Sequence, residues 1–370
     1  MVLVRKGKIG EMEAITNVAN ASFVPVRYQG FDFRNRMPKI YAANKDYSDI
    51  HFIVEDGSKI KAVAGNLLKT LVLNDKEYCY SIVGTVSTLP EESNKGYMAL
   101  MMKEIDKENI EKGIVFSMLT GKRQRYIHHG YDRSGSRIIY DITSHYYKHN
   151  NVEGNVYIRN YEERDLDIVY EIYKSNQPII VRNKEEFIID LRISNSSIYT
   201  IVDDGKVVGY FAIEDSFNAI HEISIADLKK LPIVMKSILE LLHKDRIEVI
   251  CNSLNVALQE ALDEITENRL IVEEIMWKIY RVIPFIEMCL ELNKRIKNFD
   301  TTSEVYKVDD EIIKISVNND SYKVEKTNEP YIKEFTKMEF VRYALGNTSS
   351  INRKSKIFPL ELDFNEGDMF

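Results

Sequence analysis

Residues 81–101, SIVGTVSTLPEESNKGYMALM, decide the fold. The segment begins with apolar and β-branched residues, which predict a buried strand up to Thr88. Pro90 then ends the strand, and the polar residues that follow lead to Gly96. From residue 97 the apolar residues recur at helical spacing, which predicts a helix to residue 111. A strand, a turn and the start of a helix therefore succeed one another, and the free N–H groups of such a helix start favour an anion.

The sequence on either side of this segment predicts an α/β fold. Before it, a strand at residues 3–9, a helix at 11–23 and hairpin strands from residue 50 to residue 73 supply the rest of a sheet. After it, a buried strand at 114–119 and a short helix near 123–129 complete the pattern. The helix start predicted above thus lies beside the end of a strand.

A second round of the same pattern begins after the polar residues 148–155, which form the first predicted linker. Elements predicted over residues 156–264 repeat the earlier order of strand, helix, hairpin, strand, helix and strand, so we expect an internal repeat. This second round has no glycine-rich turn between strand and helix. From Pro284, a helix, short alternating strands and a further helix predict a smaller α+β module that ends in an extended tail.

Composition and charge exclude several classes of protein. Of the 370 residues, 44% are hydrophobic and 29% are charged, which is typical of an ordered globular chain with more than one core. The formal net charge of −7 disfavours nucleic-acid binding, which needs a concentrated basic face. Charged residues occupy the start of the chain, where a secretory signal is apolar, and no stretch is apolar for long enough to cross a bilayer. We therefore expect a soluble cytoplasmic protein.

Neither the cysteines nor the histidines predict a metal site. Cys79, Cys251 and Cys289 lie far apart in apolar surroundings, which predicts buried free thiols. His128 and His129 are adjacent, but a metal site needs three or four converging ligands, and no recognisable spacing supplies them. We expect these two histidines to pack in the turn that follows them.

Residues 81–101 resemble the cofactor motif of the GNAT acyltransferase superfamily. In that family the strand ends in a splay, its backbone bonds the pantetheine arm of the cofactor, and the turn presents amides to the pyrophosphate. The resemblance implies backbone contacts from Val86 and Thr88 and a further cofactor contact at Gly121. It also implies a pyrophosphate turn formed by Ser93, Asn94, Lys95, Gly96, Tyr97 and Met98.

The turn matches the family pattern in part. The family has Arg or Gln at the position of Ser93 and often a small residue at the position of Met98, and only Gly96 matches fully. Backbone donors need no particular side chain, so the turn retains the groups that would bind a phosphate. The alternative is an ordinary strand, turn and helix that bind no ligand.

Residues 119–132, LTGKRQRYIHHGYD, resemble a second signature, that of the tandem GNAT proteins of the enhanced intracellular survival (Eis) group. In those proteins a tyrosine in the position of Tyr126 lies near the departing thiolate, and a phenol with a pKa of about 10 can donate a proton to it. The resemblance makes Tyr126 the candidate general acid, and the alternative is a packed helix residue. Lys122, Arg123 and Arg125 either contact phosphate or form a solvated basic turn.

The end of the chain carries a third resemblance, over residues 340–346, 358–364 and 368–370. Eis-like proteins end in a sterol-carrier-like domain whose terminus enters the active site of the first domain, where the terminal carboxylate acts as the base. The resemblance assigns this role to the carboxylate of Phe370. Burial of the terminal ring, worth roughly 2 kcal/mol, would hold the end in place. The alternative is a disordered acidic tail.

These observations predict an α/β chain of two tandem GNAT-like domains, residues 1–150 and 151–283, with mixed, mostly antiparallel sheets. A sterol-carrier-like α+β domain follows at residues 284–370. The resemblance implies an N-acetyltransferase that moves an acetyl group from acetyl-CoA to a primary amine of a small molecule or an exposed lysine. It implies that no metal is needed. It also implies that the chain self-associates as a hexamer. The alternatives are a catalytically silent relative that serves as a binding or scaffold protein, and an acyl or lipid carrier.

Overall fold

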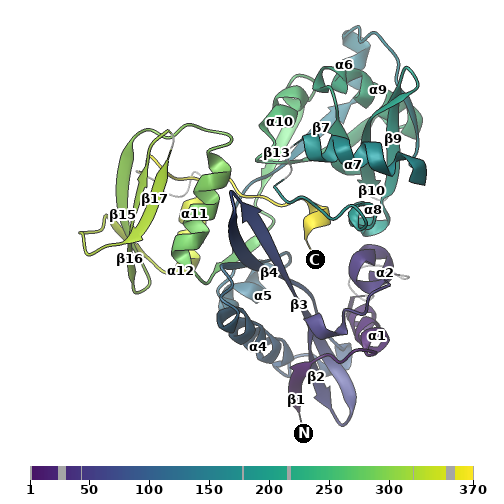
Figure 1. Cartoon of the computed structure of the whole chain (residues 1–370). Coiled ribbons are helices and arrows are strands. Elements are labelled where there is room, and N and C mark those ends of the chain that lie inside the picture. The colour runs from purple at the N-terminus through teal and green to yellow at the C-terminus, as the bar shows by residue number, and fades with distance from the viewer. Residues whose placement is uncertain are drawn as a thin grey trace.

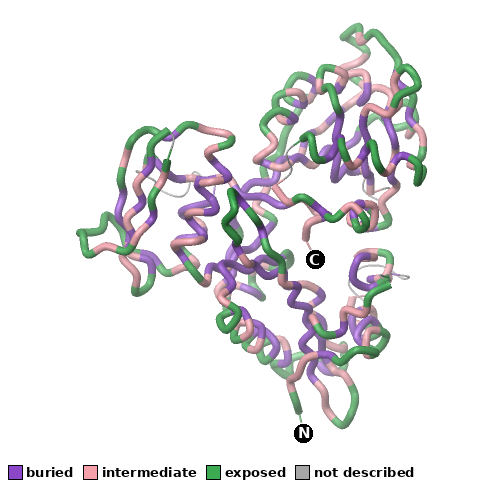
Figure 2. The backbone as a smooth tube through the Cα atoms, in the orientation of Figure 1, coloured by how far each residue is buried: buried purple, intermediate pink, exposed green. Residues whose placement is uncertain are grey.

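The computed structural model describes residues 2–23, 31–42, 44–176, 179–214, 218–319, 321–346 and 355–369. Its elements form three lobes, each built on one sheet, and the end of the chain lies between the first and second lobes (Figure 1). Buried positions gather inside each lobe and where the lobes meet (Figure 2). The predicted α/β class, with two similar sheets and a smaller third one, is confirmed.

The first lobe contains a seven-stranded mixed sheet. Its order is β1 (Leu3–Lys6), β2 (His51–Asp56), β3 (Lys59–Leu73), β4 (Lys76–Thr88), β5 (Phe116–Leu119), β14 (Met276–Ile279) and β6 (Asp132–Arg133). Helix α1 (Met12–Phe23) packs against β3 and β4, while α4 (Tyr97–Glu111) packs against β2, β3 and β4. Along β4, alternate side chains belong to different cores: Tyr80 and Ile82 join the α1 core, and Val83 joins the α4 core. The two helices therefore cover opposite faces of the sheet.

The second lobe repeats this plan. Its sheet has the order β13 (Asn268–Val272), β7 (Arg137–Thr143), β12 (Arg246–Asn252), β11 (Ala219–Ile225), β10 (Lys206–Glu214), β9 (Ser197–Asp203) and β8 (Tyr157–Asn160). Its helices are α6 (Ser144–His149), α7 (Leu166–Ser175), α8 (Phe187–Leu191), α9 (Leu231–Leu242) and α10 (Val256–Asp263). Strands β11 and β12 are parallel, as β4 and β5 are in the first lobe, and their other neighbours are antiparallel. The expected internal repeat is present in the order of the strands.

The two large sheets exchange strands along the sequence, close to the predicted boundaries at residues 150 and 283. β7 precedes residue 150, yet it pairs with β12 and β13 in the second sheet. β14 precedes residue 283, yet it pairs with β5 and β6 in the first sheet. Periodicity identifies a strand but not its partner, so a division into contiguous segments could not show this exchange.

The third lobe has a four-stranded sheet, with the order β17 (Tyr322–Lys326), β16 (Glu311–Val317), β15 (Thr302–Val308) and β18 (Lys333–Phe335). It is covered by α11 (Val282–Asn293) and α12 (Lys337–Leu345). The space between the sheet and the helices is filled by aromatic rings with centroids 4.7–6.1 Å apart, from Tyr306, Phe335, Phe340, Tyr343 and Phe358. This packing gives the lipid-carrier alternative no support, because rings occupy the place of an apolar ligand.

The final segment, residues 355–369, leaves the third lobe and crosses to the junction of the other two (Figure 1). Alternate apolar side chains are buried along it, at Ile357, Phe358, Leu360, Leu362 and Phe364. The Phe364 ring lies 5.5 Å from Tyr80, 6.2 Å from Phe116 and 5.8 Å from Trp277, measured between ring centroids. Phe364 of the tail thus joins the first lobe's core, on the face opposite α4, whereas Phe358 belongs to the third lobe.

The three cysteines are free thiols, as predicted. Cys251 and Cys289 are buried, and burial raises the pKa of both thiols above the usual range. Cys79 is only partly buried, so the prediction of burial is wrong for it. None of the helices in the described ranges is long and apolar enough to cross a membrane.

Candidate acyltransfer site

Strands β4 and β5 separate beside the turn that leads to α4. They pair over Tyr80↔Phe116, Ser81↔Ser117 and Ile82↔Met118, and no pair follows. β4 continues to Thr88, whereas β5 ends at Leu119. The register of β3 and β4 shifts between Val63 and Gly65, and opposite this bulge Thr85 has a φ of +51°. β4 thus runs past the last pair with β5, and on that side Val86 and Thr88 pair with no strand in the described ranges. The Ser22 hydroxyl of α1 bonds the N–H and C=O of Thr88, at 3.2 and 2.8 Å.

The turn after β4 presents the start of α4 without a side-chain cap. Asn94 and Gly96 both have left-handed backbones, with φ of +64° and +78°. Glycine adopts this conformation without strain, and asparagine tolerates it better than most residues do. Gly96 is the N-cap residue, and no side chain in the part of the chain that the structure describes caps the first amides of the helix. The N–H groups that begin at Tyr97 are therefore available to an anion, and the dipole of this 15-residue helix favours one.

Two lysines and a carboxylate surround this turn. Glu92 accepts hydrogen bonds from Lys61 and Lys95, each 2.6 Å long. Bonding to these ammonium groups lowers the pKa of Glu92 and raises the pKa values of both lysines. Lys95 is half-exposed but its charge is already matched, so a phosphate at the turn would compete with Glu92 for it.

Tyr126 lies against the same side of the splay as α4. It ends α5 (Arg123–Tyr126), only 8% of it is exposed, and it packs in one cluster with Tyr97, Met101 and Leu119. Val86 and Met98 contact that cluster from the rim. The structure therefore brings together four of the residues selected from sequence: Val86, Tyr97, Met98 and Tyr126.

Gly121 makes room for the ring of Tyr126. Its backbone φ is +140°, and a Cβ there would lie 3.1 Å from Tyr126 Cε2. Any larger residue would press on the phenol ring. Gly121 therefore supports the candidate acid by its small size.

Burial raises the pKa of Tyr126 to about 12, and Arg125 opposes that rise. The phenol consequently stays protonated throughout the neutral range, which a proton donor requires. The Tyr126 ring also meets Tyr131 edge to face, with centroids 6.5 Å apart and an interplanar angle of 70°. This contact fixes the orientation of the phenol.

The basic residues around Tyr126 differ in their availability. Arg123 forms two hydrogen bonds with Asp132, of 2.5 and 2.9 Å, and so is not free for phosphate. Lys122 and Arg125 are exposed and form no ion pair with any residue in the described ranges.

His128 is exposed and His129 is half-buried. Across the part of the chain that the structure describes, no group of three or more His, Cys, Asp or Glu residues is arranged to hold a metal.

The carboxylate of Phe370, the candidate base, lies outside the described residues. The residues just before it are held from both large lobes. Lys39, in α3 (Pro38–Tyr41) of the first lobe, donates hydrogen bonds to the carbonyl oxygens of Gly367, at 2.6 Å, and Met369. From the second lobe, Arg182 Nε donates to Asp368 at 2.7 Å.

These tail contacts form a buried ionic cluster. Arg182 also makes a bidentate pair with Glu222, at 3.0 and 2.7 Å. Lys39 lies 3.8 Å from Asp190, and its burial lowers the pKa of the ammonium to about 8. Because buried charges are stable only with partners, each residue here holds the others in place. The cluster connects the tail to α3 and to the second sheet.

Arg137 holds the tail at a second place, a few residues before Gly367. Arg137 Nη2 donates to the carbonyl of Phe364 at 2.9 Å, and Arg137 Nη1 donates to Glu274 at 2.7 Å and to Glu366 at 3.4 Å. Asp363 lies farther from the guanidinium, at 3.6 Å. Burial raises the pKa of Asp363 to about 7, although the Arg137 charge opposes the rise.

The sequence analysis did not identify Lys39, Arg137 or Arg182. Each lies in a different segment, and none is part of a recognisable motif. The sequence feature that could have indicated Lys39 is the basic and aromatic composition around it, but composition does not show which residue Lys39 contacts. Their roles follow from the meeting of the three lobes around the tail.

Residues 3–136 match a family model described as an acetyltransferase (GNAT) domain. The match ends one residue before β7 begins, where the chain passes to the second sheet. No curated protein matches the chain.

Solved structures share the fold over nearly the whole chain. A probable N-acyltransferase of unknown function from Enterococcus faecalis is 12% identical, with a TM-score of 0.64, and covers 94% of this chain and 91% of its own. A GCN5-related N-acetyltransferase from Anabaena variabilis is 14% identical, with a TM-score of 0.65 and coverage of 92% and 89%. Eis1 from Mycobacterium abscessus is 13% identical, with a TM-score of 0.61 and coverage of 94% and 90%. Residues 3–136 of this chain therefore match the GNAT acetyltransferase domain model, and the chain shares its fold with these solved structures.

Proposed function

We propose that this protein is an Eis-like N-acetyltransferase that moves an acetyl group from acetyl-CoA to a primary amine. The observation that carries the proposal is the separation of β4 from β5 beside an uncapped α4 start and beside Tyr126. These are the three elements that acyl transfer from a CoA thioester needs: a slot for the arm, donors for the pyrophosphate and a proton donor.

In the proposed complex the pantetheine arm lies along the free edge of β4. The backbone at Val86 bonds its amides, as a neighbouring strand would. At Thr88 the arm competes with the Ser22 hydroxyl, which bonds both the N–H and the C=O of Thr88. The pyrophosphate lies at the turn of residues 93–98, where the amides from Tyr97 onward meet it. Lys95 gains a phosphate partner only by loosening its bond to Glu92.

The reaction is a direct transfer. The amine nitrogen attacks the thioester carbonyl, the carbon–sulfur bond breaks, and the acetyl group stays on nitrogen as an amide. The carboxylate of Phe370 takes the proton that the amine loses, and Tyr126 donates its proton to the departing thiolate. A protonated phenol suits the second step, because the pKa of Tyr126 is raised by burial.

The tail contacts support the role of the terminal carboxylate. Lys39 and Arg182 hold residues 367–369 between the two large lobes, one residue before the chain ends. This position is on the α1 side of the β4–β5 splay, opposite α4 and Tyr126. An amine entering from the α1 side would meet the terminus first and the thioester next.

The proposed substrate is a small molecule with a primary amine, or an exposed lysine, because an acidic protein of net charge −7 attracts cations. We also propose that the third lobe is a sterol-carrier-like domain, whose function here is to deliver the tail, and that the chain self-associates.

A second candidate, a catalytically silent binding protein, is favoured by one observation. Ser93 supplies no cation to the pyrophosphate turn, and Glu92 places a carboxylate beside it. Titration of the full chain with acetyl-CoA, followed by turnover assays on a panel of primary amines, separates the two. Binding with turnover supports the enzyme, whereas absence of acetyl-CoA binding at millimolar concentration contradicts it.

A further inference from the structure

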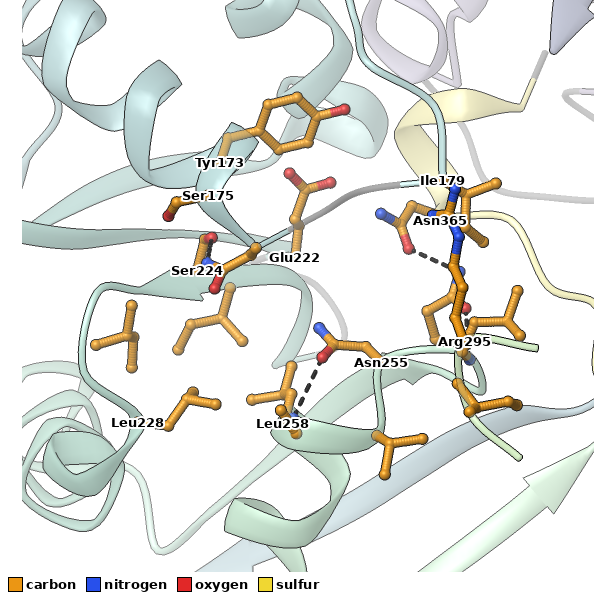
Figure 3. Close-up of a pocket in the computed structure, with 18 of the residues that line it drawn as sticks. Tyr173, Ser175, Ile179, Glu222, Ser224, Leu228, Asn255, Leu258, Arg295 and Asn365 are labelled. Carbon is orange, nitrogen blue, oxygen red and sulfur yellow. Dashed lines mark hydrogen bonds between the residues drawn. The ribbon is translucent and has the colours of Figure 1, made fainter. Parts of the chain in front are cut away.

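The second lobe has its own strand splay, and a cavity lies in it. β11 and β12 pair only over Ala219↔Glu248 and Ile220↔Val249 and then separate. A cavity of about 380 Å³ lies between the separated strands, lined by residues 222–225 of β11 and by Asn252 and the start of α10 (Figure 3). On the side of the third lobe it is lined by Leu292 of α11, Arg295 just after α11, and Asn365 of the tail. Its volume is in the range of small-molecule sites.

About half of the residues that line this cavity are aliphatic, and the rest are polar, charged or tyrosine. Apolar side chains approach it from β11, from the loop before α9, from α10 and from α11, namely Ile223, Ile225, Leu228, Leu258 and Leu292. Figure 3 shows Leu228 and Leu258 on one side of the cavity and Tyr173 and Glu222 on another. A ligand that fills the cavity therefore needs an aliphatic portion.

The charge of the lining selects an anion. Glu222 is the one carboxylate among the lining residues; it forms a bidentate pair with Arg182, which Arg182 shares with Asp368, and accepts a 2.8 Å hydrogen bond from the Tyr210 hydroxyl. Arg295 is the one cation among them, is exposed, and forms no ion pair with any residue that the structure describes. The lining thus carries one unmatched positive charge, at its α11 side.

The helix starts beside this cavity disfavour binding of a CoA pyrophosphate. In the first lobe the helix after the splayed strand starts without a cap, but in the second lobe a 3-10 turn, Leu228–Lys230, precedes α9, and its N-cap Asp227 accepts a hydrogen bond from the Lys229 N–H at 3.1 Å. At the start of α10, Asn255 Oδ1 accepts from the Leu258 N–H at 3.2 Å. Side-chain oxygens therefore occupy the 3-10 turn that leads into α9 and the start of α10, and the oxygen at the turn before α9 is charged.

We propose that this cavity binds a medium-chain aliphatic carboxylate. The chain lies in the splay against Ile223, Ile225 and Leu258, and the carboxylate reaches the guanidinium of Arg295. The site is separate from the acyltransfer site of the first lobe, and binding there does not require acetyl transfer. Because its wall includes Asn365, a bound ligand also contacts the tail next to its anchors.

The test is calorimetric titration of the full chain with octanoate, butyrate and octylamine, below the concentrations at which they form micelles. Octanoate should bind, and butyrate should bind at least 10-fold more weakly, because each buried methylene contributes about 4-fold in affinity. Octylamine has the same chain but the opposite charge, and should bind at least 10-fold more weakly than octanoate. Equal binding of octanoate and octylamine would overturn the proposal.

Two variants locate the site. Arg295→Gln should weaken octanoate binding about 5- to 10-fold, because it removes one charge-assisted contact at an exposed position. Ala257→Trp adds bulk at an exposed lining position of α10 and should abolish binding without disturbing the core. Arg192→Gln is the matched control, since Arg192 is exposed in the same lobe and does not line the cavity.

Thermal melting shows whether the variants are folded. Unchanged octanoate affinity in folded Arg295→Gln and Ala257→Trp would overturn the proposal. Acetyl transfer is not measured in this experiment, so its result is independent of the proposed enzymatic function.

Discussion

Lys39 and Met369, 330 positions apart in the sequence, are joined by a hydrogen bond from the Lys39 ammonium to the Met369 carbonyl. The same ammonium also bonds the carbonyl of Gly367. Burial removes most of the hydration of the Lys39 ammonium group, and this lowers its pKa to about 8. This loss of hydration occurs where Gly367 and Met369 of the tail meet the first lobe.

Replacement of Lys39 by methionine should release the tail. Methionine keeps the apolar stem but donates no hydrogen bond, so kcat for acetyl transfer should fall about 10-fold or more. The dissociation constant of acetyl-CoA should stay unchanged, because the cofactor elements lie on β4 and α4. Calorimetry and steady-state kinetics measure the two quantities separately.

Lys39→Arg should restore part of kcat, because a guanidinium can donate to both carbonyls. Lys45→Met, at an exposed lysine near the same helix, is the control and should behave as the parent chain. A Lys39→Met protein with normal kcat would mean that this contact does not position the terminus.

Extension of the chain by a few residues after Phe370 should separate docking from chemistry. Every side chain remains, but the free carboxylate moves away from the amine, so turnover at neutral pH should fall about 10²-fold or more. Acetyl-CoA binding should be unaffected, since the tail is not part of the proposed cofactor slot. Equal kcat in extended and native proteins, on any accepted amine, would eliminate the terminal carboxylate as the base.

Tyr126→Phe tests the proposed acid. The ring and its packing against Tyr131 are retained, and only the proton donor is lost. We expect kcat to fall about 10²-fold or more with acetyl-CoA affinity nearly unchanged. Tyr157→Phe, at a residue 65% exposed in the second lobe, removes a hydroxyl far from the splay and serves as the control. If both variants turn over alike, the proton for the thiolate comes from another group.

Ser93→Arg tests the pyrophosphate turn. The new guanidinium would restore the cation that the family has there, and a charge-assisted contact of roughly 1 to 3 kcal/mol should tighten acetyl-CoA binding 5- to 150-fold. Ser93→Gln adds length without charge and should tighten binding much less. The gain should be largest at low salt, because the new contact is between charges. No gain at low salt would place the pyrophosphate elsewhere.

The raised pKa of Asp363 predicts that the folded protein becomes less stable as the pH rises. Its folded pKa of about 7 exceeds the ordinary value of 3.8, so the folded state binds the proton more tightly than the unfolded state between these values. The free energy of unfolding should therefore decrease as pH rises from about 4 to 7, by roughly 2 to 4 kcal/mol.

Asp363→Asn should remove this decrease, since the amide keeps an oxygen for the Phe364 N–H but does not titrate. Urea unfolding at several pH values measures it. Asp300→Asn, at an exposed carboxylate, is the matched variant and should retain the pH dependence. Identical pH profiles for Asp363→Asn and the parent chain would show that Asp363 is ionised throughout.

The proposed cofactor elements could be recognised from sequence because they are local. The strand before Thr88, the break at Pro90, the left-handed Gly96 and the helix that follows are adjacent in the chain, and each depends mainly on its own backbone preferences. Tyr126 and Gly121 are also close in sequence, so their contact lay within one predicted segment. The exposure of Cys79 and the short helices between residues 33 and 41 were not predicted, because packing decides both.

By itself, the sequence determined the alternation of strands and helices, the strand, turn and helix at residues 81–111, and the α/β class. Only the tertiary structure decided which sheet received β7 and β14, and which cations held the tail. Lys39, Arg137 and Arg182 lie in separate segments and acquire their partners at distances of up to 330 positions. Backbone preference acts between neighbours in the chain, whereas burial and ion pairing act between neighbours in space, and the chain must fold before these are known.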